Sequence, residues 1–340
     1  MAKDDGLARL KQAISQNTPD SLYLLWGEED YLREYYLERL KTLLLPKGLE
    51  GMNHTRLTGG KAELSALAEA VDALPVFCPR RLVEVRDFDL YKAPADTRDR
   101  LGAMLGDLPD TCCLVFVMTD PAFKPDKRTK LHAAVQAAGT SVEFKKQGQA
   151  DLVNWIRRRF KACGKEIERQ DAEYLIFYCG GLMTGLISEI EKLAACATGN
   201  RVTRKDIDAA AVPVLDAVVW NLTDALTRRD FDCAVKTLGE LLQMRENPIM
   251  LLSVIGNQMR KLYTARLALE ANRDAEYIRT LWDMKSGYPA RLLMEAARKC
   301  GREWCREAVA LCAQTDMDMK STGRNGEELL MELLVKLAAE

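Results

Sequence analysis

The sequence predicts an α/β domain with a parallel sheet, followed by domains built only from helices. Apolar strand patterns alternate with helical patterns over residues 1–147, which is typical of βαβ units with helices on both faces of a sheet. From residue 148 onward only helical patterns are found. Of the 340 residues, 48% are apolar, so the chain can form sizeable hydrophobic cores and is not expected to be disordered.

Five short strands are expected in the first domain, and apolar residues dominate most of them. They are Leu22–Trp26, Asn53–Leu57, Leu82–Arg86, Cys112–Met118 and Ser141–Phe144. Helices are expected between them at Tyr31–Leu45, Ala62–Leu74 and Lys127–Ala138. In the second of these helices, Leu64, Leu67 and Val71 recur every three to four residues, which predicts that they share one face.

Helix start and stop signals divide the rest of the chain. Thr203, with Asp206 three residues later, has the spacing of a capping box at the start of a helix. Pro213 then interrupts the helical pattern, because proline has no backbone N–H to donate. The expected domains are the α/β domain (1–147), a small helical domain (148–212) and a larger C-terminal helical domain (213–340).

Composition excludes several classes of protein. Forty-nine basic residues nearly cancel 50 acidic ones, which does not indicate a nucleic-acid coat protein. Residues 1–5 are acidic and no apolar run approaches the roughly 20 residues that span a bilayer, so we expect a cytoplasmic protein without a signal peptide or membrane contact. The ten cysteines form no C-x-x-C pair, so no metal site is expected.

The segment after the first expected strand stands where a P-loop would be, and it lacks the chemistry of one. A P-loop reads G-x-x-x-x-G-K-[ST]: backbone N–H groups surround the phosphates, the lysine reaches them and the hydroxyl holds Mg²⁺. Gly27 keeps the first glycine, but Leu32, Arg33 and Glu34 replace the second glycine, the lysine and the hydroxyl. We therefore expect no nucleotide or other cofactor at this degenerate P-loop.

Charge reinforces that expectation and argues against an enzyme. Glu28, Glu29 and Asp30 would place three carboxylates against a triphosphate, which is repulsive at short range. The two histidines, His54 and His132, have no partner at a known catalytic spacing, so no catalytic residue is assigned. These observations favour a protein that works by binding a partner.

An α/β domain followed by a small helical domain is the order of AAA+ (RecA-like) modules, and an extra helical domain is the layout of clamp-loader subunits. Five segments resemble the delta subunit family of bacterial DNA polymerase III in order and spacing. They are Leu22–Glu34, Leu74–Val85, Val115–Leu131, Trp155–Leu193 and Asp318–Gly323. The resemblance implies an AAA+-like domain with a degenerate P-loop, a small helical lid domain and an all-α collar domain.

The resemblance also implies a function in DNA replication. Family members are part of the DNA polymerase III holoenzyme, a DNA-directed DNA polymerase, and have no ATPase activity of their own. Their collar joins a five-membered ring with the ATP-hydrolysing gamma/tau subunits and the delta-prime subunit. They bind the sliding clamp (beta subunit) and open one of its interfaces, so that the clamp can be placed on primed DNA.

The clamp-binding residues implied by the resemblance are Leu74, Pro75, Val76 and Phe77. The family's exposed hydrophobic pair maps onto Val76 and Phe77, and because the first position is usually larger, Phe77 is expected to be the main anchor. Pro75 disfavours helix at the residue before it, which predicts a turn here. The alternative interpretation is that Val76 and Phe77 pack into the core of their own domain.

A basic stretch is a second candidate contact. Lys124, Lys127, Arg128 and Lys130 lie within seven residues and could contact the DNA backbone or a neighbouring subunit. The alternative is a solvated loop and helix start.

Two other functions remain open from the sequence. An active AAA+ ATPase of DNA replication would need an arginine in a G-x-x-R context, and Thr184 stands at that position after Gly181. The delta-prime subunit usually has a Ser-Arg-Cys motif and often zinc-binding cysteines, and neither is found.

Overall fold

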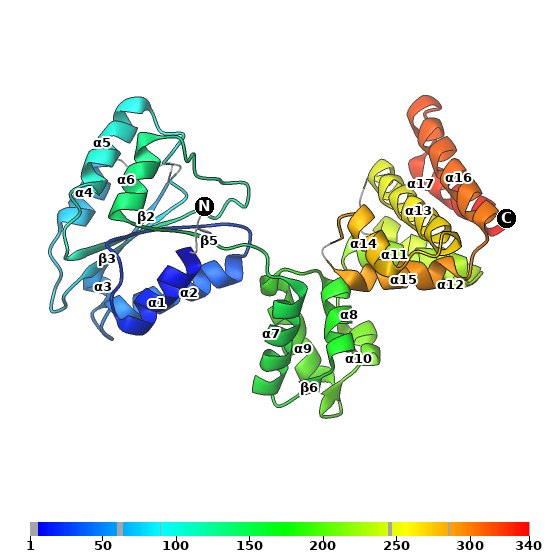
Figure 1. Ribbon diagram of the computed structural model, residues 1–340, viewed down its shortest axis with the longest axis horizontal. Coiled ribbons are helices and arrows are strands. Elements are labelled where there is room, and N and C mark those ends of the chain that lie inside the picture. The colour runs from blue at the N-terminus through cyan, green and yellow to red at the C-terminus, as the bar shows by residue number, and fades with distance from the viewer. Residues whose placement is uncertain (1–5, 60–63, 89, 244–246, 285, 340) are drawn as a thin grey trace. The chain divides into compact units, whose positions relative to one another are not determined.

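The computed structural model describes residues 6–59, 64–88, 90–243, 247–284 and 286–339 (Figure 1). The chain forms two compact units. The first contains residues 1–147 together with 182–184, and the second contains residues 148–181 and 185–340. The further division of the second unit at residues 212 and 213 stays a prediction.

The first unit is built on a five-stranded parallel sheet. Its strands are β1 (Leu22–Trp26), β2 (His54–Thr58), β3 (Arg81–Arg86), β4 (Cys112–Val117) and β5 (Gly139–Glu143), in the order β2-β3-β4-β1-β5. Each neighbouring pair is parallel, for example Leu22 opposite Leu114 and Gly139. The predicted parallel sheet is confirmed, with strand ends that differ by up to two residues from the expected ones.

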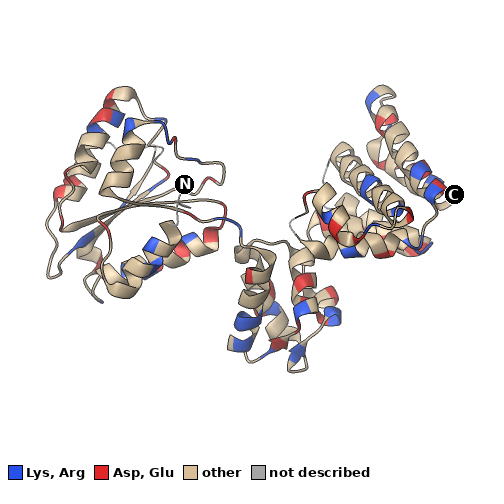
Figure 2. Cartoon of the chain, viewed as in Figure 1, with Lys and Arg blue, Asp and Glu red and all other residues tan. Residues whose placement is uncertain are grey.

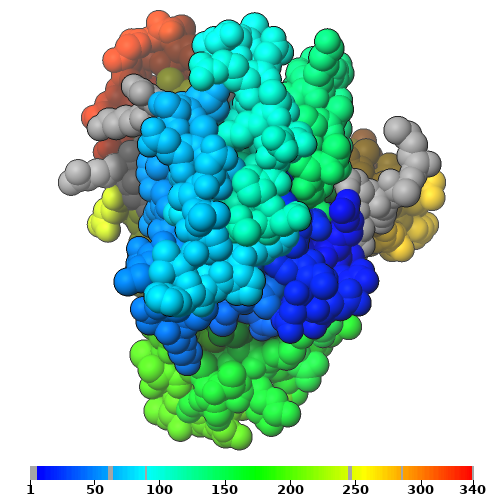
Figure 3. Space-filling view, turned by 90° about the vertical axis from the view of Figure 1, so that its left-hand side faces the viewer, coloured from blue at the N-terminus to red at the C-terminus, as the bar shows by residue number. Residues whose placement is uncertain are grey.

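Helices cover both faces of this sheet. They are α1 (Gly6–Gln16), α2 (Asp30–Leu44), α3 (Glu50–Asn53), α4 (Leu64–Asp72), α5 (Ala95–Leu105) and α6 (Lys130–Ala138). Along β1, Leu22, Leu24 and Trp26 face a core shared with α4, α5 and α6, whereas Tyr23 and Leu25 face a core shared with α1 and α2. Figures 1 and 3 show α4, α5 and α6 side by side on one face.

Three helices of this unit were not expected from the sequence. Helix α3 has four residues, which is too short for a helical period to be recognised. Helix α5 buries only Leu101 and Leu105, so its remaining residues carry little apolar pattern. Helix α1 has a clear buried face that includes Leu10 and Ile14, and the sequence analysis missed it.

The second unit is largely helical. Its helices are α7 (Gln149–Ala162), α8 (Arg169–Cys179), α9 (Met183–Cys196), α10 (Arg204–Ala210), α11 (Leu215–Thr227), α12 (Phe231–Gln243), α13 (Pro248–Glu270), α14 (Ala275–Leu281), α15 (Gly287–Ala297), α16 (Arg302–Ser321) and α17 (Gly326–Ala339). The predicted capping box of Thr203 and Asp206 opens α10. One extended core of buried side chains runs through α11 to α17.

The expectation that only helices follow residue 148 was wrong. Strands β6 (Glu166–Ile167) and β7 (Arg201–Val202) pair in parallel. Two residues are too few to show the alternation by which a strand is recognised in a sequence. The pair is reinforced by Lys165, whose Nζ donates to the carbonyl oxygens of Ala197 at 2.8 Å and Gly199 at 2.7 Å.

Within the second unit, α8 is tied to the C-terminal helices. The buried carboxylate of Glu173 accepts hydrogen bonds from Arg169 at 3.0 Å and from Arg291 of α15 at 2.7 Å. Phe177 packs edge-to-face against Trp220 of α11, with ring centroids 6.2 Å apart.

Among the described residues no single helix is long and apolar enough to cross a membrane. Helices α10 and α11 reach that length and composition only as a pair, and the pair is bent by 112° at its break.

Candidate functional site

The glycine that survives from the P-loop pattern has a structural role. Gly27 adopts φ +123°, a conformation that side chains other than glycine rarely adopt. A Cβ atom at this position would lie 2.4 Å from the carbonyl oxygen of Phe144, which follows the neighbouring strand β5. Glycine is therefore required here by backbone geometry and packing, whether or not a phosphate binds.

The side chains at the other three positions of the P-loop pattern make contacts within their own domain. Arg33, only 2% exposed, donates from Nη1 to the carbonyl oxygen of Gly27 at 3.0 Å and from Nη2 to Asp30 at 2.7 Å. Leu32 packs against the core under α2. Glu34 accepts two hydrogen bonds from Arg86 at 2.9 and 2.7 Å. The cation that replaces the lysine is thus bound to the loop itself.

Glu29 adds a buried carboxyl group to this loop. Its side chain is fully buried and accepts a hydrogen bond from the backbone N–H of Met183, a residue that groups with the first unit, at 3.3 Å. Burial raises the pKa of Glu29 above its ordinary value, although the hydrogen bond from Met183 opposes the shift. A buried carboxyl group in this position further disfavours a phosphate.

The Leu74–Phe77 segment lies on the surface, directly after α4. Leu74 is 77% exposed and Phe77 is 88% exposed, whereas Val76 is 36% exposed. The alternative that Phe77 packs into the core of its own domain is therefore wrong. Covering an apolar side chain of this size with a partner would remove its surface from water and stabilise the complex.

Asn53 holds this segment in place, a role that no sequence motif indicated. Its buried side chain accepts from the Val76 N–H at 2.7 Å and donates from Nδ2 to the Val76 carbonyl oxygen at 2.9 Å and to the Leu49 carbonyl oxygen at 3.1 Å. Phe77 follows with φ +55°, an unusual conformation for a bulky residue. Asn53 and Val76 are 23 residues apart, so no local pattern reveals the contact.

We expect Asn53→Ala to destabilise the first unit by about 1–3 kcal/mol, because it leaves buried backbone groups without partners. Hydrogen exchange of the β2 and β3 amides under increasing urea would measure the change. Asn154→Ala, on an exposed position of α7, is the matched control and should have no effect on these amides. Equal exchange in both variants would contradict the role assigned to Asn53.

The basic stretch lies on the loop before α6 and on the first residue of that helix, and Figure 2 colours Lys and Arg positions of the ribbon blue. Lys124, Lys127, Arg128 and Lys130 are all exposed. Arg128 pairs with Asp126 at 3.2 Å, and the three lysines have no ion pair with any described side chain. The four cations therefore share one exposed surface segment, which both interpretations of the sequence allow, and their contact with DNA or a subunit stays a prediction.

A buried ionic cluster around Glu84 was also missed from the sequence. Glu84, on β3, is fully buried and lies 3.0 Å from His54 Nε2, 3.1 Å from Lys41 Nζ, 2.5 Å from Arg86 Nε and 3.5 Å from Arg56 Nε. Burial would raise the pKa of Glu84, but the hydrogen bonds from His54, Arg86 and Lys41 outweigh it and lower the pKa well below its ordinary value. A single glutamate within an apolar strand is the signal that could have identified the cluster.

The described residues contain no group of three His, Cys, Asp or Glu side chains arranged to hold a metal ion.

Comparison with known proteins finds the same protein family in both units. A family model described as DNA polymerase III, delta subunit matches residues 23–145, and one described as DNA polymerase III delta subunit, C-terminal domain matches residues 216–337. DNA polymerase III subunit delta of Bacillus subtilis (strain 168) is 23% identical over 330 residues, covering 95% of this chain and 94% of its own. The same subunit of Escherichia coli (strain K12) is 20% identical over 308 residues, covering 88% and 85%.

The fold agrees with these matches. The solved structure of the Bacillus subtilis DNA clamp loader delta protein superposes with a TM-score of 0.54 and 20% identity, covering 98% of this chain and all of that one. The first unit therefore has the predicted AAA+-like α/β fold, followed by a helical region. The two family models match in order at both ends of the chain, and the relatives align over nearly its full length. This chain belongs to the DNA polymerase III delta subunit family of clamp loader components.

Proposed function

We propose that this chain binds the sliding clamp (beta subunit) through the Leu74–Phe77 segment and opens it, without hydrolysing ATP. The observation that carries the proposal is the 88% exposure of Phe77 on a turn that Asn53 fixes from beneath. A rigid turn that presents an aromatic side chain suits a partner pocket, because little conformational freedom is lost on binding.

Opening the clamp requires a difference in affinity between two states. A ligand shifts an equilibrium only to the extent that it binds one state better than the other. The segment would therefore bind a distorted clamp edge more tightly than the edge of the closed ring. ATP-driven changes in neighbouring subunits would expose or cover the segment and so time the opening.

The C-terminal helices are the proposed contact with the rest of the clamp loader. Met331 and Val335 lie one turn apart on α17 and are exposed, and Val235 is exposed on α12, which packs against α17. Exposed apolar side chains on a helical domain fit the packing of a collar. We propose that the partners there are the ATP-hydrolysing gamma/tau subunits and delta-prime, in a five-membered ring that encloses primed DNA.

Nucleotide titration separates this function from that of an active AAA+ ATPase. Because Arg33 is buried and bonded to the loop backbone, calorimetric titration of the isolated chain with Mg²⁺ and ATP is expected to give no saturable heat up to about 1 mM, a concentration that corresponds to a binding free energy of about −4 kcal/mol. Binding in the micromolar range would favour the enzyme instead.

The clamp proposal itself is tested by co-purification. The chain is mixed with its cognate sliding clamp in the absence of nucleotide and the mixture is separated by size. A stable complex of the two is expected for the native chain, and the complex should be lost when Phe77 is replaced by alanine.

A further inference from the structure

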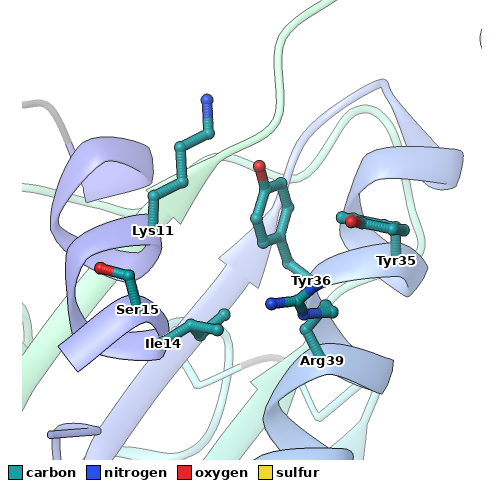
Figure 4. Close-up of a pocket in the computed structure, with 6 residues that line it drawn as sticks. All are labelled: Lys11, Ile14, Ser15, Tyr35, Tyr36 and Arg39. Atoms are coloured by element: carbon teal, nitrogen blue, oxygen red, sulfur yellow. The ribbon is translucent and has the colours of Figure 1, made fainter. Parts of the chain in front are cut away.

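A small pocket lies between α1 and α2, on the first unit and apart from the Leu74–Phe77 segment. Its volume is about 190 Å³, and Figure 4 shows the six side chains that line it. They are Lys11, Ile14 and Ser15 of α1 and Tyr35, Tyr36 and Arg39 of α2. Ligand pockets for drug-sized molecules have volumes of about 300–1,000 Å³, so this one suits a single small group.

The pocket is cationic. Lys11 and Arg39 are exposed, stand on opposite walls, and form no ion pair with any side chain in the described part of the chain. Lys11 Nζ lies 6.0 Å from the centroid of the Tyr36 ring, within the range of a cation–π interaction. The hydroxyl of Ser15, also on the α1 side, donates to the carbonyl oxygen of Gln12 at 2.9 Å, so the charge of the pocket comes from the two cations. These groups favour an anion.

The pocket is also aromatic. Tyr36 is backed by Phe144, whose ring is 6.0 Å away and inclined by only 23°. Tyr35 meets the Tyr36 ring edge-to-face at 5.2 Å and is 42% exposed. The packing fixes Tyr36. The Tyr35 ring is stacked against Tyr31, with centroids 6.2 Å apart, and the part of it that Tyr31 and Tyr36 do not cover is exposed to solvent.

We propose that this pocket binds one nucleotide unit of a single-stranded nucleic acid, with its phosphate between Lys11 and Arg39 and its base against Tyr35. Positive charge combined with accessible aromatic rings is the arrangement by which proteins hold single strands without sequence preference. A carboxylate of an acidic peptide would satisfy the two cations but would not use the exposed part of the Tyr35 ring. The inference does not depend on clamp binding.

The test measures binding of a fluorescently labelled 20-residue oligo-dT to the full chain by anisotropy, at several salt concentrations. The variants are Tyr35→Ala and the double replacement Lys11→Gln with Arg39→Gln. The matched control removes the same charge elsewhere on the first unit, by Lys47→Gln with Arg100→Gln, since both residues are exposed. Clamp binding by all variants should be unchanged.

Tyr35→Ala is expected to lower the affinity of the chain for oligo-dT about tenfold, because one base loses its stacking partner. The double variant should reduce the slope of log affinity against log salt by about 0.7–1.4, the value for one or two phosphate contacts on a single strand. A strand of the same length that lacks bases should have the same low affinity for the native chain and for the Tyr35→Ala variant.

Further binding measurements distinguish a single strand from other anionic ligands. Thymidine monophosphate and a duplex of equal length should bind more weakly than the oligo-dT, and a glutamate-rich peptide should not compete. The proposal is overturned if the native chain does not bind oligo-dT or if the control variant loses as much affinity as the pocket variant. It is equally overturned if the free nucleotide, the duplex or the acidic peptide proves the better ligand.

Discussion

Replacing Phe77 by alanine should weaken binding of the sliding clamp by roughly tenfold to a hundredfold. Burying one phenylalanine side chain removes apolar surface from water and stabilises a complex by about 1.5–3 kcal/mol, and 1.4 kcal/mol corresponds to tenfold in affinity. Phe77 is 88% exposed in the free chain, so almost all of this surface is available to a partner. Calorimetric titration of the cognate clamp, without nucleotide and at constant salt, measures the change.

The same replacement should leave the fold intact, because the Phe77 side chain makes little contact with its own domain. Leu281→Ala is a matched control, since Leu281 is an apolar side chain 53% exposed on α14 of the other unit. Its clamp affinity should equal that of the native chain. Unchanged affinity of the Phe77 variant, or an equal loss in the control, would exclude the Leu74–Phe77 segment as the main anchor.

Replacing Glu84 by glutamine should destabilise the first unit by about 3–5 kcal/mol, the effect of removing one partner from a buried ion pair. The change removes the buried negative charge that Lys41 and Arg86 share on β3, and leaves these two cations only the more exposed carboxylates of Glu38 and Glu34. Hydrogen exchange of the β2 and β3 amides under increasing urea at pH 7 measures the loss. Glu38→Gln removes the other, exposed carboxylate bound to Lys41 and should cost less than about 1 kcal/mol.

The pH dependence gives an independent test of the Glu84 cluster. Because the folded state lowers the pKa of Glu84, its contribution is fully present above the unfolded value of about 4.3 and is lost as the pH falls through the folded pKa. The stability difference between the native chain and Glu84→Gln should therefore be retained between pH 7 and pH 5 and should shrink below pH 4. A difference that grows on acidification would contradict the assignment.

Much of this protein follows from local patterns in its sequence. Apolar runs and helical periods predicted the parallel α/β sheet and the helical region that follows it in the chain. They do so because burial of one face of a strand or helix requires apolar residues at regular spacing. The residue types at Gly27, Leu32, Arg33 and Glu34 were sufficient to identify a P-loop without its phosphate-binding groups. The exposure of Phe77 agrees with the segment singled out from the sequence.

Only the tertiary structure decided which distant residues meet. Asn53 reaches Val76 across 23 residues, and Glu84 gathers cations from α2, β2 and β3. The pocket between α1 and α2 depends in the same way on how two helices pack. Periodicity records which side of an element is buried, but it carries no information about the partner on that side. The sequence by itself therefore predicted most of the elements and showed that the residue types of a P-loop are missing, whereas packing determined the rigid turn under Phe77 and the charged clusters.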